Sequence, residues 1–181
     1  MSHDTDRPPL SRPLRVDEIR DGAQGDIEAT QSEMAAVAKL LDLRGVKELS
    51  FAYRLSHAGG GRLRLVGRLT AAVTQTCVVS LEPVEASLDV PVEAEFWPVS
   101  LIDQLERSAE DPGGPGQLDW PEPIVDGRID LGPLLYETLA TSLDPYPKRE
   151  GVSFDWSQGV PEQGSASGSG PFAALAELKR R

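Results

Sequence analysis

The chain has 181 residues, of which 18 are Lys or Arg and 29 are Asp or Glu, so its formal net charge is −11. This length suits one domain with a buried core plus a tail, and no apolar run is long enough to span a membrane. The single cysteine excludes an internal disulfide and a zinc site built from several cysteines. We therefore expect an acidic cytoplasmic protein without a bound metal or cofactor.

The charge is unevenly distributed along the chain. Residues 81–145 contain 15 acids and two bases, whereas residues 44–68 contain six bases and one acid. An acidic protein repels nucleic acid at long range, but a local group of basic side chains can still bind phosphate. The basic segment is therefore where RNA contacts are to be sought.

Residues 1–28 are rich in proline and charge and are expected to form an extended N-terminal arm. A single α+β domain is expected over residues 29–156. Its first element is a short amphipathic helix, because Thr30 and Glu33 have the spacing of a capping box and apolar residues follow at helical spacing.

Two runs of alternating apolar and polar residues follow, over residues 49–56 and 62–73, and a glycine-rich segment separates them. This pattern predicts a β-hairpin, and Gly67 within the second run indicates a bulge. A third alternating run covers residues 88–97. Pro91 within it predicts an edge strand or a bulged strand, because proline cannot donate to the ladder.

Residues 101–107 predict one or two helical turns, and a longer helix is expected between Asp130, which can cap it, and Asp144. Residues 157–170 form a flexible linker of Ser, Gly, Gln and Pro. The fold class is therefore α+β. A mainly antiparallel twisted sheet, open or barrel-like, has flanking helices and a tethered C-terminal helical segment over residues 171–181.

Four arginines of the hairpin are candidates for RNA binding: Arg54, Arg62, Arg64 and Arg68. Alternation places them on the sheet face opposite the apolar residues, and a guanidinium group can bind phosphate through two bonds. In the alternative, the third strand lies beside them and Asp89, Glu93 and Glu95 form cross-strand ion pairs. That arrangement leaves at most a rim of unpaired arginine for RNA.

The C-terminal segment places Phe172, Leu175 and Leu178 on one helical face, which makes them candidates for docking. So short a helix is not stable alone, so this face is expected to pack either on the chain's own domain or on a partner. The long linker before it favours a partner.

Three segments resemble the YceD-like family, a bacterial and plastid group associated with accumulation of large-subunit ribosomal RNA. They are residues 67–83, 126–147 and 171–179, and the family-motif positions are Cys77, Glu82, Pro83, Asp130 and Glu137. Many relatives have a second cysteine three positions after the first, where this chain has Ser80. One thiolate cannot build a tetrahedral zinc site, so we expect no metal there.

The resemblance implies a non-enzymatic bacterial factor in large-subunit ribosomal RNA accumulation or ribosome assembly. Its expected partners are ribosomal RNA, a large-subunit ribosomal protein or an assembly factor, and neither DNA nor a membrane. The alternative is an acidic adaptor or chaperone that holds a basic ribosomal protein without touching RNA. An enzyme based on Cys77 is disfavoured, because neither His3 nor His57 has a reason in the sequence to meet it.

Overall fold

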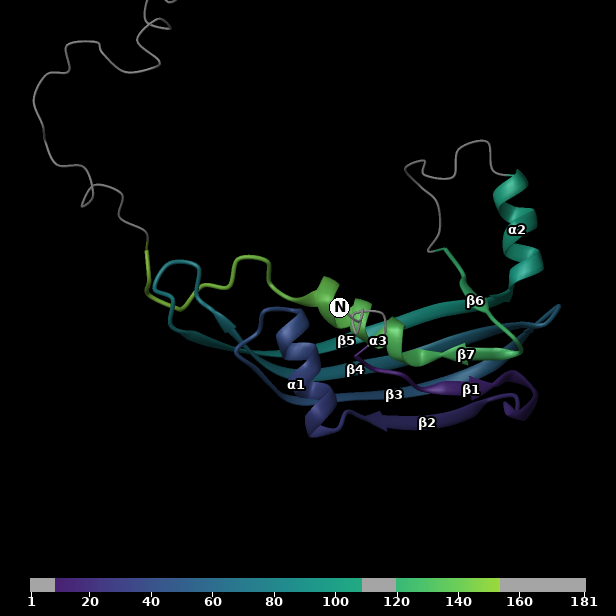
Figure 1. The fold of residues 1–181 in the computed structure, drawn as a ribbon, viewed down its shortest axis with the longest axis horizontal. Coiled ribbons are helices and arrows are strands. Elements are labelled where there is room, and N and C mark those ends of the chain that lie inside the picture. Colours follow the sequence, from purple (N-terminus) through teal and green to yellow (C-terminus); the bar gives the residue numbers. More distant parts are fainter. Residues whose placement is uncertain (1–8, 109–119, 154–181) are drawn as a thin grey trace, which may run out of the picture. The chain divides into compact units, whose positions relative to one another are not determined.

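The computed structural model describes residues 9–108 and 120–153. Five strands form one sheet in the order β2-β3-β4-β5-β6, antiparallel except for the parallel pair of β5 with β6 (Figure 1). They are β2 (Ala23–Glu28), β3 (Gly45–Gly59), β4 (Arg62–Thr76), β5 (Pro83–Pro98) and β6 (Glu122–Ile124). Because β2 and β6 are the two edges, the sheet is open and does not form a barrel.

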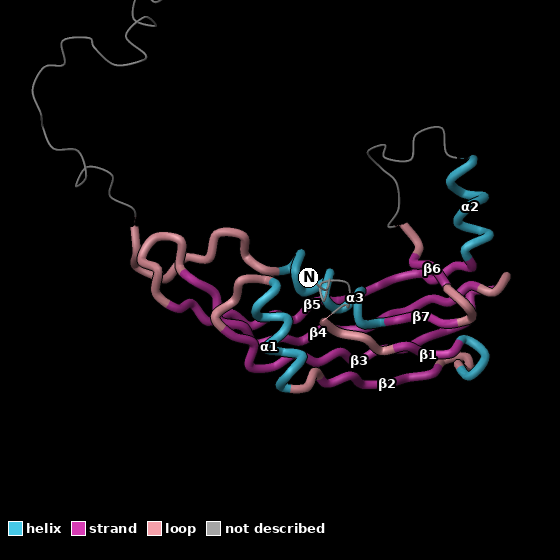
Figure 2. Tube along the Cα trace, in the orientation of Figure 1, coloured by secondary structure: helices cyan, strands magenta, loops and turns pink. Residues whose placement is uncertain are grey.

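The other described elements complete an α+β fold (Figure 2). They are β1 (Pro13–Arg15), the 3-10 helix η1 (Val16–Glu18), α1 (Gln31–Leu40), α2 (Val99–Ser108), β7 (Arg128–Asp130) and α3 (Leu131–Ser142). β1 and β7 pair in a small second sheet, and α1 and α3 lie on one face of the large sheet. The predicted α+β class with a mainly antiparallel sheet is therefore confirmed.

The β3–β4 hairpin supplies much of the core. Its register pairs Phe51 with Leu69 and Leu55 with Leu65, so the apolar residues of both runs point to the same face. These side chains are buried together with Val37 of α1 and residues of α3. Removing apolar surface from water is the main force that holds the helices on the sheet, and the opposite face stays open to solvent.

Gly67 does not mark a bulge, so that prediction is wrong. Its pairing is regular, and the register shifts of the hairpin lie between Val46 and Glu48 and between His57 and Gly59. A Cβ at position 67 would lie 2.7 Å from Cζ of Phe51. The glycine instead makes room for this buried ring.

Pro91 lies in an edge region, as predicted. β5 pairs with β4 along its whole length but with β6 only from Phe96 to Pro98. Backbone groups alternate between the two sides of a strand, so the Pro91 nitrogen can face the unpaired side. No ladder hydrogen bond is then lost.

The described part of the expected arm, residues 9–28, contains β1, η1 and β2 and belongs to the domain. β2 pairs with β3 and β1 pairs with β7, while Leu10 is only 1% exposed. The domain therefore begins before residue 29. The sequence did not show this, because the strands that pair with β1 and β2 lie further along the chain.

The chain divides into residues 1–150 and residues 151–181, and only residues 151–153 of the second part are described. The predicted linker 157–170 and the helical motif 171–181 thus lie outside the described residues. Among the described helices, none has the length and apolar character needed to cross a membrane.

Candidate functional site

Two of the candidate arginines form cross-strand ion pairs on the open face of the sheet. Nη2 of Arg64 lies 2.9 Å from Oε2 of Glu93, and Arg68 is paired with Asp89. Side chains in these pairs are more than half exposed, so the pairs add little to stability. Their effect is electrostatic, because each carboxylate offsets a positive charge that a phosphate group would otherwise meet.

The other two arginines have uncharged partners. Arg54 lies against the side-chain amide of Gln24. Arg62 donates to two carbonyl groups of the hairpin turn, and its Cζ lies 5.2 Å from the centre of the Trp97 ring. This cation–π contact keeps the positive charge. Glu95, expected to pair with an arginine, instead accepts a hydrogen bond from Nε1 of Trp97 at 2.8 Å.

An open pocket of about 600 Å³ lies beside Arg62 and Trp97. It is lined by Gly60, Arg62, Trp97, Leu101, Gln104 and Leu105. An indole and a guanidinium group are flat surfaces on which unpaired RNA bases can stack. The sequence pattern indicated Arg62 but not Trp97, because only the pairing of β4 with β5 brings these two residues together.

Two segments that carry family-motif positions meet just after β4. The turn there begins with Cys77, and the N–H of Val78 donates to the carbonyl oxygen of Pro147 at 2.9 Å. Glu82, at the end of the turn, forms an ion pair with Arg149. The chain that follows α3 is therefore fastened to the cysteine turn.

The Cys77 thiol is fully buried and surrounded by hydrogen-bond donors. Hydrogen bonds from the Ser80 hydroxyl and amide, and then from the Arg149 amide, lower the pKa of the thiol to about 6. His57 lies at the other end of β4, on the order of 45 Å away for a strand of 15 residues. The structure thus does not bring His57 to Cys77, and His3 lies outside the described residues.

Three large apolar side chains beside this turn are exposed: Val78 by 51%, Leu81 by 67% and Tyr146 by 74%. We call them the apolar patch. Leu81 has a φ of 59°, a left-handed conformation that is unfavourable for a residue with a side chain. Its N–H donates to the Cys77 carbonyl at 3.0 Å, and its carbonyl accepts from Nη2 of Arg44 at 2.6 Å. The Val78–Pro147 hydrogen bond brings the segment of Tyr146 to this turn. Several exposed apolar side chains in one region are typical of a protein-binding surface.

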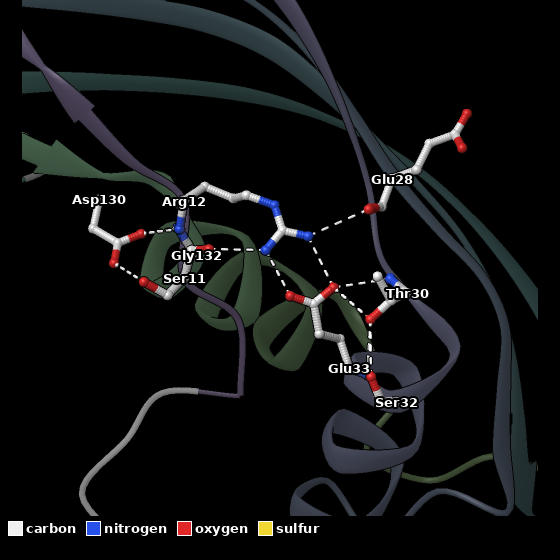
Figure 3. A network of polar contacts seen from close by, with 8 residues as sticks. All are labelled: Ser11, Arg12, Glu28, Thr30, Ser32, Glu33, Asp130 and Gly132. Carbon is white, nitrogen blue, oxygen red and sulfur yellow. Dashed lines mark hydrogen bonds and ion pairs between the residues drawn. The ribbon is translucent and has the colours of Figure 1, made fainter.

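Asp130 joins the N-terminal segment to α3 (Figure 3). It accepts a hydrogen bond from the N–H of Gly132 at 2.9 Å, which confirms the predicted helix cap. It also accepts from the N–H of Arg12 at 2.6 Å and from the hydroxyl of Ser11 at 2.7 Å. These contacts give this family-motif position a structural role.

Arg12 extends the network to α1 (Figure 3). Its Nη1 and Nη2 donate to the two carboxylate oxygens of Glu33 at 2.6 and 2.8 Å. Glu33 also accepts from the N–H of Thr30 at 2.8 Å, so the predicted capping box is confirmed. The Arg12 guanidinium, with help from Thr30, lowers the pKa of Glu33 to about 2. Three segments far apart in the sequence are thus tied together.

The remaining predicted positions do not join a common site. Pro83 begins β5, and Glu137 is exposed on α3. Burial, and then the charge of Glu137, raise the pKa of Glu122. The docking candidates Phe172, Leu175 and Leu178 lie outside the described residues. Within the described ranges, no three His, Cys, Asp or Glu side chains are placed to hold a metal ion.

Together these features define an α+β domain with one solvent-exposed sheet face and a cysteine turn fastened to the segment after α3. Residues 65–179, more than half of the chain, match the family described as Large ribosomal RNA subunit accumulation protein YceD. The chain belongs to the YceD family, which confirms the resemblance and links the protein to large-subunit ribosomal RNA accumulation. No curated protein and no solved structure matches it.

Proposed function

We propose that this protein acts in the cytoplasm as a non-enzymatic adaptor that holds a basic ribosomal protein and so supports large-subunit ribosomal RNA accumulation. The observation that carries the proposal is the pairing of Arg64 with Glu93 and of Arg68 with Asp89. These pairs offset much of the local positive charge that direct RNA binding needs, while the net charge of the chain is −11. A negative potential instead attracts a basic protein.

The apolar patch of Val78, Leu81 and Tyr146 also supports a protein partner. Burial of apolar side chains supplies affinity that does not depend on charge. A basic ribosomal protein released alone binds nucleic acid non-specifically. Holding it until it joins the large subunit therefore favours accumulation of the RNA with which it assembles.

Crosslinking in cells, followed by identification of bound proteins and sequencing of bound RNA, tests the proposal. We expect direct crosslinks to a basic large-subunit protein, and ribosomal RNA recovered only through that protein. Leu81→Gly should lower the amount of crosslinked ribosomal protein severalfold, because it removes the exposed side chain. It should not lower the melting temperature, because glycine adopts the positive φ of this position without strain. Val125→Ala removes another exposed apolar side chain and is the control. Wild-type chain that crosslinks to RNA but to no ribosomal protein would contradict the proposal.

A second candidate function is direct binding of single-stranded ribosomal RNA at the pocket beside Arg62 and Trp97. The contact of these two side chains favours this function, since no carboxylate in the described structure forms an ion pair with Arg62 and its positive charge can attract phosphate. In the same experiment it predicts direct RNA crosslinks that are lost in Trp97→Ala but retained in Leu81→Gly.

Cys77→Ser should support wild-type ribosomal RNA accumulation if the protein is not an enzyme. The thiol is buried, and the hydrogen bonds that it accepts come from neighbouring parts of the same domain. Complementation of a strain that lacks the gene, with protein levels measured in parallel, checks this. Loss of RNA accumulation at a normal protein level would favour a catalytic thiol.

A further inference from the structure

The outer side of β2 pairs with no other strand in the part of the chain that the structure describes (Figure 1). At its C-terminal end the Glu28 carbonyl accepts a hydrogen bond from Nη2 of Arg12 at 3.3 Å. The N–H of Ala29, directly after β2, donates to the carbonyl oxygen of Leu49 at 2.9 Å. Backbone groups alternate along an antiparallel strand, so those of Gln24 and Asp26 face away from β3. These two residues present N–H donors and carbonyl acceptors to a further strand.

The unpaired side of β5 is less suited to a further strand. Residues 83–95 pair only with β4, but Pro91 lies among them. Proline offers no N–H, and its ring obstructs an approaching backbone. β2 contains no proline, and its register with β3 shows no shift. β6, the other edge of the sheet, has only three residues and one of them is Pro123. β2 is therefore the longer edge and the one without proline.

The side chains of β2 favour a basic partner. Asp26 and Glu28 are exposed, and neither carboxylate has a hydrogen-bond or ion-pair partner among the described residues. A hollow of about 220 Å³ lies next to them, and the small residues Ser50 and Ala52 line it. Arg68 also lines it, but Asp89 offsets the charge of that arginine. The aliphatic stem of a lysine can lie over these residues while its ammonium group meets a carboxylate.

We infer that β2 binds an extended, lysine- or arginine-rich protein segment, which adds to the sheet as a further strand. This inference rests on the proposed adaptor function and specifies how the basic partner is held. Main-chain hydrogen bonds supply affinity, and Asp26 and Glu28 supply selectivity. The same carboxylates repel each other if two copies of β2 meet, so they disfavour pairing of the chain with itself.

A short peptide of alternating Lys and Thr is the probe, with its affinity measured by NMR titration of the full-length protein. We expect shifts of the β2 amides and no binding of the same peptide with Glu in place of Lys. Gln24→Pro removes an outward N–H and should weaken binding about tenfold. Gln24→Ala loses the same side chain but keeps the N–H, so its affinity should stay within about twofold.

Charge reversal gives a second test that does not depend on how proline is tolerated. Asp26→Lys should also weaken binding about tenfold, because it places like charges opposite each other. Glu48→Lys is the matched control, since Glu48 is exposed on β3, where it pairs with Ala72 of β4, and is not part of the outer edge of β2. No binding to wild type, or equal affinity for wild type, Gln24→Pro and Asp26→Lys, would overturn the inference.

The outcome is separable from that of the adaptor function. If the ribosomal protein recovered from cells binds wild type and Gln24→Pro equally, the β2 inference is overturned while the adaptor function stands. If wild type binds no ribosomal protein, the adaptor function fails. A dimer of the chain that Gln24→Pro dissociates would show that β2 pairs with a second copy and would also overturn the inference.

Discussion

Gly132→Ala is expected to destabilise the domain by about 3 kcal/mol, although alanine is the better helix former. A Cβ on Gly132 would lie 2.2 Å from the carbonyl oxygen of Leu10 and 2.7 Å from Cα of Ser11. Both contacts are with backbone, which cannot rotate away as a side chain can. α3 and the N-terminal segment must then separate, which weakens the Asp130 contacts as well.

Thermal unfolding followed by circular dichroism measures the effect, and a loss of this size lowers the midpoint by about 6–12 °C. Gly45→Ala is the matched control, because nothing lies within 4 Å of its Cβ position. Its stability should change by less than about 0.5 kcal/mol. A wild-type midpoint for Gly132→Ala would show that the N-terminal segment is not packed against α3 in this way.

Glu33→Gln should lower the free energy of unfolding by about 2 kcal/mol near neutral pH, because it breaks the charged, two-bond contact with Arg12. The pKa of Glu33 is lowered from 4.5 to about 2 in the folded protein. The stabilisation is therefore complete above the unfolded pKa and is lost as the pH falls through about 2. The difference between the two proteins should shrink over this range.

Urea unfolding of both proteins at a series of pH values measures that difference in the free energy of unfolding. Because the other carboxylates are common to both proteins, their contribution cancels in the difference. Asp17→Asn makes the same chemical change in the exposed ion pair with Arg15 and should have little effect. A difference between wild type and Glu33→Gln that stays constant down to pH 2 would contradict the assigned ion pair.

Three of the family-motif positions, Cys77, Glu82 and Asp130, help to hold the domain together. Asp130 caps α3 and binds the N-terminal segment, and Cys77 accepts hydrogen bonds from its own turn and from the Arg149 amide. Partner contacts are better sought among groups that remain exposed, which are the apolar patch and the edge of β2. Changes in these exposed groups are therefore expected to weaken partner binding without unfolding the domain.

Local patterns in the sequence were sufficient to predict the main elements. Thr30 and Glu33 predicted the start of α1, Asp130 predicted the start of α3, and alternation predicted the β3–β4 hairpin. Each of these signals depends on residues a few positions apart, which interact whatever the rest of the chain does. The α+β class and the common face of the four arginines follow from the same patterns.

Only the tertiary structure showed which of those arginines form ion pairs with carboxylates and which do not. The register of β5 on β4 sets Glu93 near Arg64 and Trp97 near Arg62, and no local pattern contains that register. Similarly, the incorporation of residues 9–28 depends on partners such as β3 and β7, which come later in the chain. Contacts between distant segments arise from packing and pairing of the whole domain, so the sequence could propose a basic face but could not show how much of it is neutralised.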